Sequence, residues 1–247
     1  MTATQPRRYT MADVRARALK QRDSWWTVLL VDPVASRLTL VAAALRLSPN
    51  LITTLSLGVG IVAAWRFWDG ALVAGAILFH VSFTIDCVDG KLARLTGGGT
   101  PFGPWLDYAA DRARVVAVTY GLLLGQWRIT GEAIHVYLAV AVVFADMMRY
   151  IDVLQEDRLR RRTLGDRAQQ VHASVRDSVG WYAGLRERLA GWRIRPHLFS
   201  GVEFQMAVFI IGPLVGAVPQ VAIAALGLLA VFEVAAVYRL WVTVRAA

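Results

Sequence analysis

The chain has 247 residues, of which 56% are hydrophobic and 18% charged, and its mean hydropathy is +0.46. The apolar residues form long uncharged runs. A helix of about 20 apolar residues crosses the roughly 30 Å hydrocarbon core of a membrane, so these runs exclude a water-soluble globule and predict a polytopic all-α membrane protein. The formal net charge is +9.

The amino-terminal residues 1–48 alternate basic side chains with Trp25, Trp26 and an apolar run that is too short to span. This pattern predicts one or two interfacial helices on the cytoplasmic side. The break at Ser48-Pro49-Asn50 then begins the transmembrane domain, residues 49–247, for which we expect six spanning helices. The uncharged runs place them over 51–68, 70–95, 102–126, 130–151, and two within 204–232 that meet in a turn near 217–219. Residues 152–197, rich in Arg and acid, are expected to form a cytoplasmic helical extension.

The placement of the cations predicts the orientation. If both termini are cytoplasmic, 25 of the 27 Lys and Arg residues lie inside, and the exceptions are Arg66 and Arg128. This distribution follows the positive-inside rule and indicates a multi-pass protein of the cell membrane. It favours anionic membrane lipids over nucleic acid as the partner of the charge.

Four carboxylates lie near the cytoplasmic ends of the second and third predicted helices. Asp86 and Asp89 are spaced i,i+3, and Asp107 and Asp111 are spaced i,i+4, so each pair shares one helix face. A short loop joins the two helices, and all four side chains can converge on a cytosol-facing cavity. Their mutual repulsion requires cations, and oxygen ligands select hard ions such as Mg²⁺ or Mn²⁺. Two divalent ions would balance the four charges.

Small residues and one arginine accompany the acids. The full pattern is Asp86-x2-Asp89-Gly90-x2-Ala93-Arg94-x8-Gly103-x3-Asp107-x3-Asp111. It resembles the signature of the CDP-alcohol phosphotransferase family at every position. A weaker resemblance extends to Ser48-Pro49-Asn50-x2-Thr53 and to the six-helix hydropathy.

The resemblance implies an enzyme that transfers the phosphoalcohol part of a CDP-alcohol, such as CDP-diacylglycerol, to the hydroxyl of a polar alcohol with release of CMP, in phospholipid biosynthesis. It implies that the four Asp residues hold the Mg²⁺ or Mn²⁺ ions and that Asp111 also acts as the general base. Binding of the CDP-alcohol is implied for Asp86, Gly90, Ala93, Arg94 and Gly103. A homodimer is also implied by the resemblance.

The sequence leaves the acceptor open. Arg149, at the inner end of the fourth helix, is a candidate for binding it, and the Arg residues of 149–195 favour an anionic acceptor. The long segment before Pro49 is similar to members that use a soluble CDP-polyol, so that donor is an alternative within the class. Outside the class, a divalent-cation transporter using the same acids and a catalytically inactive scaffold are the competing hypotheses.

Overall fold

The computed structural model describes residues 9–164, 188–196 and 199–245, and this part of the chain is helical, with one isolated β-bridge between Asp23 and Ile194. Several helices contain a π-helical turn, labelled η. The elements are α1 (Met11–Asp13), η1 (Val14–Ala18), η2 (Thr27–Val31), α2 (Asp32–Ala44), α3 (Pro49–Trp68), α4 (Leu72–Thr96), α5 (Gly103–Thr119), η3 (Tyr120–Leu124), α6 (Gly125–Thr130), α7 (Ile134–Leu164), α10 (Gly201–Met206), η6 (Ala207–Ile211), α11 (Gly212–Leu214) and α12 (Val218–Arg245).

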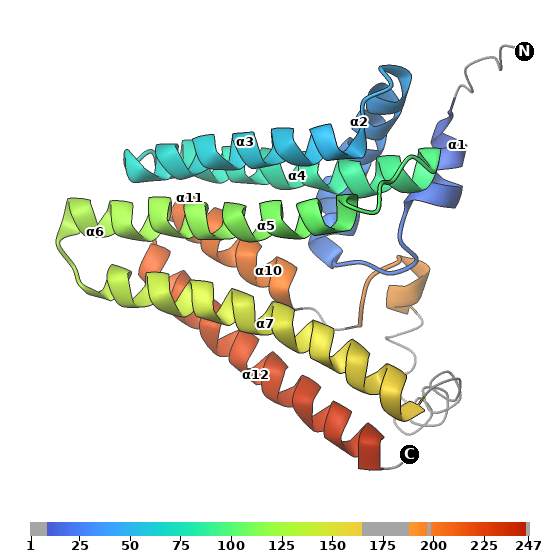
Figure 1. The fold of residues 1–247 in the computed structure, drawn as a ribbon. Coiled ribbons are helices and arrows are strands. Elements are labelled where there is room, and N and C mark those ends of the chain that lie inside the picture. The colour runs from blue at the N-terminus through green and yellow to red at the C-terminus, as the bar shows by residue number, and fades with distance from the viewer. Residues whose placement is uncertain (1–8, 165–187, 197–198, 246–247) are drawn as a thin grey trace, which may run out of the picture.

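The first two predicted spanning helices are confirmed as α3 and α4, which lie side by side and antiparallel (Figure 1). Ser48 is the N-cap of α3, and its hydroxyl accepts a hydrogen bond from the Leu51 amide at 3.2 Å, while Pro49 occupies the first turn, where no intrahelical donor is lost. Gly97 ends α4 with φ +69°, a left-handed conformation that glycine adopts without strain.

The third helix is one continuous run of α5, η3 and α6 that packs against α3. A Cβ at Gly121 would lie 2.2 Å from the Ala64 carbonyl oxygen, so only glycine permits this approach of the two backbones. The close contact fixes the face that α5 turns toward α3 and α4.

The fourth helix is longer than predicted. α7 continues through residue 164 without a break, so residues 152–164 of the expected extension prolong the membrane helix. Residues 165–187 of that extension lie outside the described residues. The charged sequence after 151 contains no Pro or Gly before 165, so nothing in it ends a helix.

The last apolar run folds as two helices, as predicted. The segment α10–η6–α11 ends at Leu214, Gly216 turns the chain with φ +67°, and α12 returns beside α7 (Figure 1). Figure 1 also shows that α1 and the end of α12 lie at the same end of the bundle. The six expected helical segments are therefore all present.

Length and composition identify a different set of candidate spans. Within the described residues five helices are long and apolar enough to cross a membrane, namely Thr27–Ala44, Pro49–Trp68, Leu72–Thr96, Ile134–Leu159 and Val218–Val242. The third expected helix is missing from this set because α5 is interrupted by charged residues, and Gly201–Leu214 is missing because it is short. η2 and α2 together reach spanning length, although Figure 1 shows α2 running across the α3–α4 pair instead of alongside it. The interfacial position of residues 1–48 stays a prediction.

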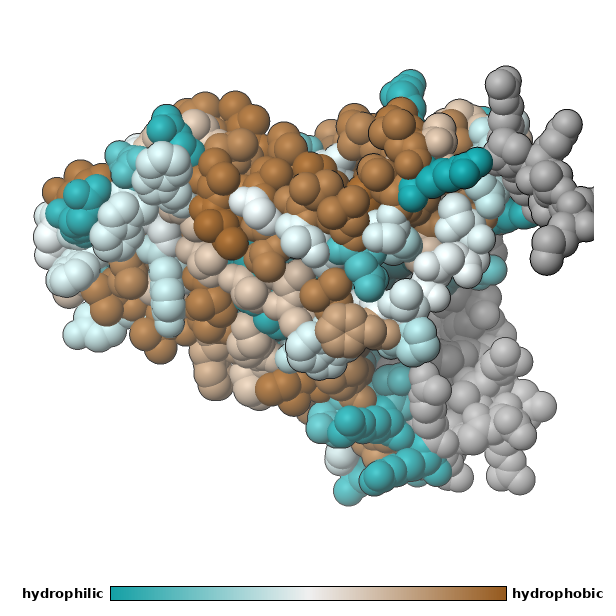
Figure 2. Space-filling model, turned by 45° about the horizontal axis from the view of Figure 1, so that its top comes forward, coloured by the Kyte–Doolittle hydropathy of each residue, from teal (hydrophilic) through white to brown (hydrophobic). Residues whose placement is uncertain are grey.

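One face of the protein is apolar in its middle. Figure 2 shows hydrophobic side chains gathered across the centre of one face, with hydrophilic ones toward the ends. Large apolar residues of α7 and α12 are strongly exposed, as Tyr137 and Val234, each 71% exposed, illustrate. Such a surface suits lipid contact, and the protein is a multi-pass membrane protein.

Buried contacts hold the amino-terminal helices against the C-terminal end of α4. The Lys91 ammonium lies 3.0 Å from a carboxylate oxygen of Asp32, and both side chains are less than a tenth exposed. Arg193 joins the same carboxylate at 3.1 Å. A buried charge requires such partners, so α2 and the segment around residue 193 are fixed beside the end of α4 that carries the acidic residues.

Candidate active site

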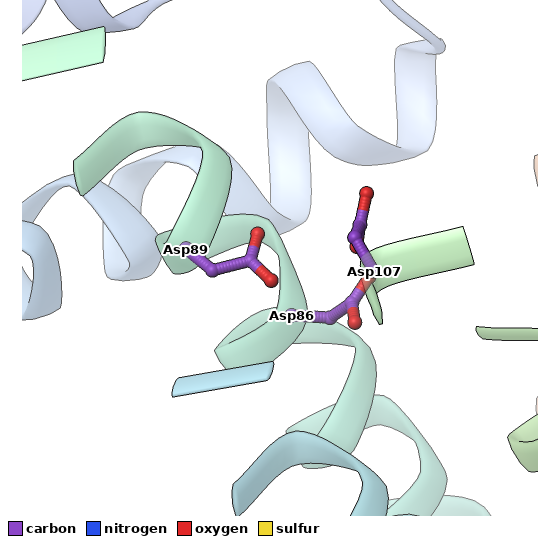
Figure 3. A group of neighbouring side chains, drawn as sticks. All are labelled: Asp86, Asp89 and Asp107. Carbon is purple, nitrogen blue, oxygen red and sulfur yellow. The ribbon is translucent and has the colours of Figure 1, made fainter. Parts of the chain in front are cut away.

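Three of the four predicted carboxylates meet. Asp86 and Asp89 project from α4 and Asp107 from α5, and each offers a carboxylate oxygen that lies within 4.8 Å of the others (Figure 3). Asp89 is only 7% exposed, Asp86 is partly buried and Asp107 is exposed, so the group is accessible from the Asp107 side. Carboxylates this close repel one another strongly unless a cation lies among them.

Hydroxyl groups of α3 orient two of these carboxylates. The Thr53 hydroxyl donates to Oδ2 of Asp89 at 2.5 Å, and the Ser56 hydroxyl donates to Oδ1 of Asp86 at 3.1 Å. The Gly90 amide also donates to Asp89. These neutral donors orient the carboxylates without supplying positive charge.

Asp111 lies apart from this group, on the other side of an arginine. Its carboxylate forms ion pairs with Arg112 and Arg114, and Arg114 also lies 2.9 Å from Oδ1 of Asp86. The Arg114 side chain is 1% exposed. Arg114 therefore links the three-carboxylate group to Asp111.

Arg112 extends the polar network toward α7 and α10. It forms an ion pair with Asp146, and the amide of Gln205 donates to the other oxygen of Asp146 at 2.8 Å. The Tyr150 ring lies against the same guanidinium, with 5.2 Å between the guanidinium carbon and the ring centroid. Asp146, which lies one helical turn before Arg149 on α7, thus pairs with Arg112 of α5.

The small motif residues surround Arg94. Its Nε donates to the Ala18 carbonyl at 2.8 Å, and a Cβ at Gly90 would lie 3.2 Å from its Nη1. Glycine thus leaves room for the guanidinium beside α4. Ala93 is partly buried on the same stretch of helix.

Gly103 lies at the start of α5. Its amide donates to the Thr100 hydroxyl at 3.0 Å, and a Cβ there would lie 3.3 Å from the Asn50 side-chain oxygen. This contact brings the loop before α5 close to the beginning of α3. The roles of Gly90, Ala93, Arg94 and Gly103 in binding a CDP-alcohol stay predictions.

Arg149 is engaged elsewhere. Its guanidinium lies 3.2 Å from the Glu233 carboxylate of α12 and 4.8 Å from the Phe232 ring centroid. The structure thus places Arg149 in an α7–α12 contact, and its role in binding an acceptor stays a prediction.

The donor set fits a hard divalent cation. Asp86, Asp89 and Asp107 supply three carboxylates and no sulfur or nitrogen, and the chain offers Mg²⁺ or Mn²⁺ the ligands these ions prefer. A divalent cation held by these carboxylates would attract a polyphosphate, polarise it and neutralise its oxygens.

The match to known proteins agrees with this chemistry. The family model for CDP-alcohol phosphatidyltransferase matches residues 46–172, just over half of the chain. The chain belongs to this family. All eight motif positions from Asp86 to Asp111 lie inside the matched region, and so do the α3 hydroxyl residues Thr53 and Ser56.

Within the family, the chain is similar to synthases of phosphatidylinositol phosphate and archaetidylinositol phosphate. It is 31% identical over 91 residues to an archaetidylinositol phosphate synthase of Pyrococcus horikoshii, covering 36% of this chain and 48% of the relative. It is 36% identical over 98 residues to a phosphatidylinositol phosphate synthase of Corynebacterium glutamicum, covering 39% and 41%. The chain thus spans less than half the length of these curated relatives. A crystal structure of the Mycobacterium tuberculosis phosphatidylinositol phosphate synthase with CDP-DAG bound aligns with a TM-score of 0.43 at 23% identity, over 85% of this chain and 94% of that one.

The sequence analysis missed Arg114, Ser56 and Gly60, which lie beside the acidic residues of this chain. Arg114 had a detectable signal, because an arginine at i,i+3 from Asp111 in a membrane helix needs an anionic partner. Ser56 is spaced i,i+3 from Thr53 and so shares its helix face. Gly60, whose Cβ would lie 2.7 Å from Arg114 Cγ, has no sequence signal that separates it from a helix-packing glycine.

Proposed function

We propose that the protein transfers the phosphoalcohol group of a CDP-alcohol to an acceptor hydroxyl and releases CMP. The observation that carries the proposal is the meeting of Asp86, Asp89 and Asp107 at the inner ends of α4 and α5, in a chain of this family. A divalent ion bound there would polarise the pyrophosphate and neutralise the leaving CMP.

Residues of the chain are assigned to the proton transfer and to the binding of the phosphate oxygens. The acceptor oxygen forms a bond to the phosphorus of the phosphoalcohol group, the bond from that phosphorus to the oxygen of CMP breaks, and the acceptor proton must leave. We assign that proton to Asp111, which Arg112 and Arg114 hold in a fixed orientation. Arg94 is assigned to the phosphate oxygens, since its planar fork matches them.

The names of the relatives support a donor and an acceptor class. We propose CDP-diacylglycerol as donor and an inositol phosphate as acceptor, because the similar curated proteins are phosphatidylinositol phosphate and archaetidylinositol phosphate synthases. A soluble CDP-polyol remains the alternative donor to include in the assay. The homodimer stays a prediction from the family resemblance.

The orientation is also a proposal. Placing both termini and the acidic group in the cytoplasm puts 25 of 27 basic residues inside, in agreement with the positive-inside rule. The carboxylates lie toward one end of the bundle, whereas transport sites are typically near the bilayer midplane, and this favours the enzyme over a cation transporter.

The test is CMP release by the purified protein in lipid nanodiscs. With Mg²⁺, CDP-diacylglycerol and inositol phosphate we expect CMP, and Asp107→Ala should abolish it while the protein stays folded by circular dichroism. Leu154→Ala, on the exposed surface of α7, is the control and should keep full turnover. Wild-type protein that releases no CMP with any lipid or soluble CDP-alcohol and any polyol acceptor refutes the proposed function.

A further inference from the structure

Residues 188–196, which come after α7 in the chain, pair with the loop that follows η1. The guanidinium of Arg193 donates to the Lys20 carbonyl oxygen, from Nε at 3.0 Å and from Nη2 at 2.9 Å. The main chains of the two segments also pair. The Asp23 amide donates to the Arg193 carbonyl and the Arg195 amide donates to the Asp23 carbonyl, each at 2.9 Å. These contacts fix the position of the loop after η1.

A buried carboxylate connects this contact to α4. Nη2 of Arg193 lies 3.1 Å from one oxygen of Asp32, and the Lys91 ammonium lies 3.0 Å from the other. The side chains of Asp32 and Lys91 are less than a tenth exposed. Ion pairs enclosed in this way keep their position, because separating them would leave a buried charge without a partner. Arg193 therefore joins the loop after η1 to the helix that carries Arg94.

The last residue of η1 holds the guanidinium of Arg94. The Ala18 carbonyl, two residues before that of Lys20, accepts a hydrogen bond from Nε of Arg94 at 2.8 Å. Ala18 is fully buried and packs with Val14 of η1. A Cβ at Gly90 would lie 3.2 Å from Nη1 and 3.7 Å from Nη2 of Arg94, so the guanidinium lies over Gly90. Because Nε is used by the carbonyl, the two Nη groups are the ones that can bind phosphate oxygens.

We propose that Arg193 positions Arg94 for the phosphates of the CDP-alcohol by holding the Ala18 carbonyl on the Arg94 guanidinium. The inference rests on the phosphate role of Arg94 in the proposed function. A long side chain that is ordered before binding loses less entropy on binding, and this typically improves a Kd by about 2- to 10-fold. Arg193 is thus a positioning residue, and it lies outside residues 46–172, the region that the family model matches.

The test is binding of CDP with Mg²⁺ to the full chain in nanodiscs, measured by isothermal titration calorimetry. Arg193→Met removes the donor to the Lys20 carbonyl, while Lys91 still neutralises Asp32. The Kd for CDP should rise about 3- to 10-fold, and Arg193→Lys should recover part of the loss. Arg195→Met is the matched control on the same segment. Its guanidinium lies 3.7 Å from the Asp23 carboxylate, and its removal should change the Kd by less than about twofold.

A double-mutant cycle separates positioning from a general loosening of the fold. Arg94→Met alone should raise the Kd for CDP by at least as much as Arg193→Met. Adding Arg193→Met to it should cause no further rise, because the residue through which Arg193 acts is then missing. The Kd for Mn²⁺ without nucleotide, measured by electron paramagnetic resonance, should stay unchanged in Arg193→Met, whereas a loosened α4 would weaken it.

The proposal is overturned by an unchanged Kd for CDP in Arg193→Met, by additive effects of the two substitutions, or by a loss of Mn²⁺ affinity in Arg193→Met. A wild type that does not bind CDP with Mg²⁺ also overturns it. If Arg193→Met does not fold, Arg193→Gln keeps a polar end at the same place and carries the same expectations. CDP binding is measured without an acceptor, so the expected Kd values together with no CMP release refute the proposed reaction and retain the role of Arg193.

Discussion

Removing the Thr53 hydroxyl tests whether α3 orients the carboxylates of the acidic site. It donates to Asp89 at 2.5 Å, and the residue is 3% exposed, so Thr53→Val removes one donor with almost no change of shape. A hydrogen bond to a charged group contributes about 1.5–3 kcal/mol, and tenfold in an equilibrium constant corresponds to about 1.4 kcal/mol. We therefore expect the Kd for Mn²⁺ to rise about 10- to 100-fold, the range typical when a ligand loses its orienting partner.

The measurement is Mn²⁺ titration by electron paramagnetic resonance, with CMP release at saturating metal recorded beside it. Thr53→Ser keeps the hydroxyl and should restore most of the affinity. Thr54→Val is the matched control, because the Thr54 hydroxyl donates to the Asn50 carbonyl at 3.0 Å on the exposed side of the same helix turn. A Kd for Thr53→Val within about twofold of the wild type would show that α3 does not orient the metal ligands, since losing a hydrogen bond that orients a ligand normally weakens metal binding by more than that.

Three further substitutions test other parts of the structure. Asp111→Asn should slow CMP release by about 100-fold or more at unchanged Mn²⁺ affinity, since general-base catalysis contributes that much, and equal losses in both measurements would assign Asp111 to the metal. Arg149→Ala should raise the KM for inositol phosphate but not the KM for the CDP-alcohol. Glu233→Gln removes the carboxylate charge that pairs with Arg149 and should lower the KM for inositol phosphate. An unchanged KM for inositol phosphate in both variants would exclude Arg149 from the acceptor site. Gly121→Leu should destabilise the α3–η3 contact by about 1–3 kcal/mol or more in thermal unfolding, because its Cβ would lie 2.2 Å from the Ala64 carbonyl oxygen, and an unchanged unfolding temperature would contradict that close approach.

The sequence alone determined the membrane class and the position of the acids. Long uncharged runs have few alternatives to spanning helices, and helical periodicity sets which residues of one helix share a face. The spacing of Asp86, Asp89 and Asp107, with a short loop between their helices, was therefore enough to predict that they meet. Ser48 and Pro49 likewise set the start of α3 by local capping.

The tertiary structure decided what stands beside those acids. Arg114 between Asp86 and Asp111, and the Thr53 and Ser56 hydroxyls, depend on which faces of α3, α4 and α5 meet. That choice is made by close contacts between residues far apart in the chain, such as Gly121 against Ala64. Periodicity carries no information about the rotation of one helix relative to another, because the rotation is set by the packing of both surfaces together.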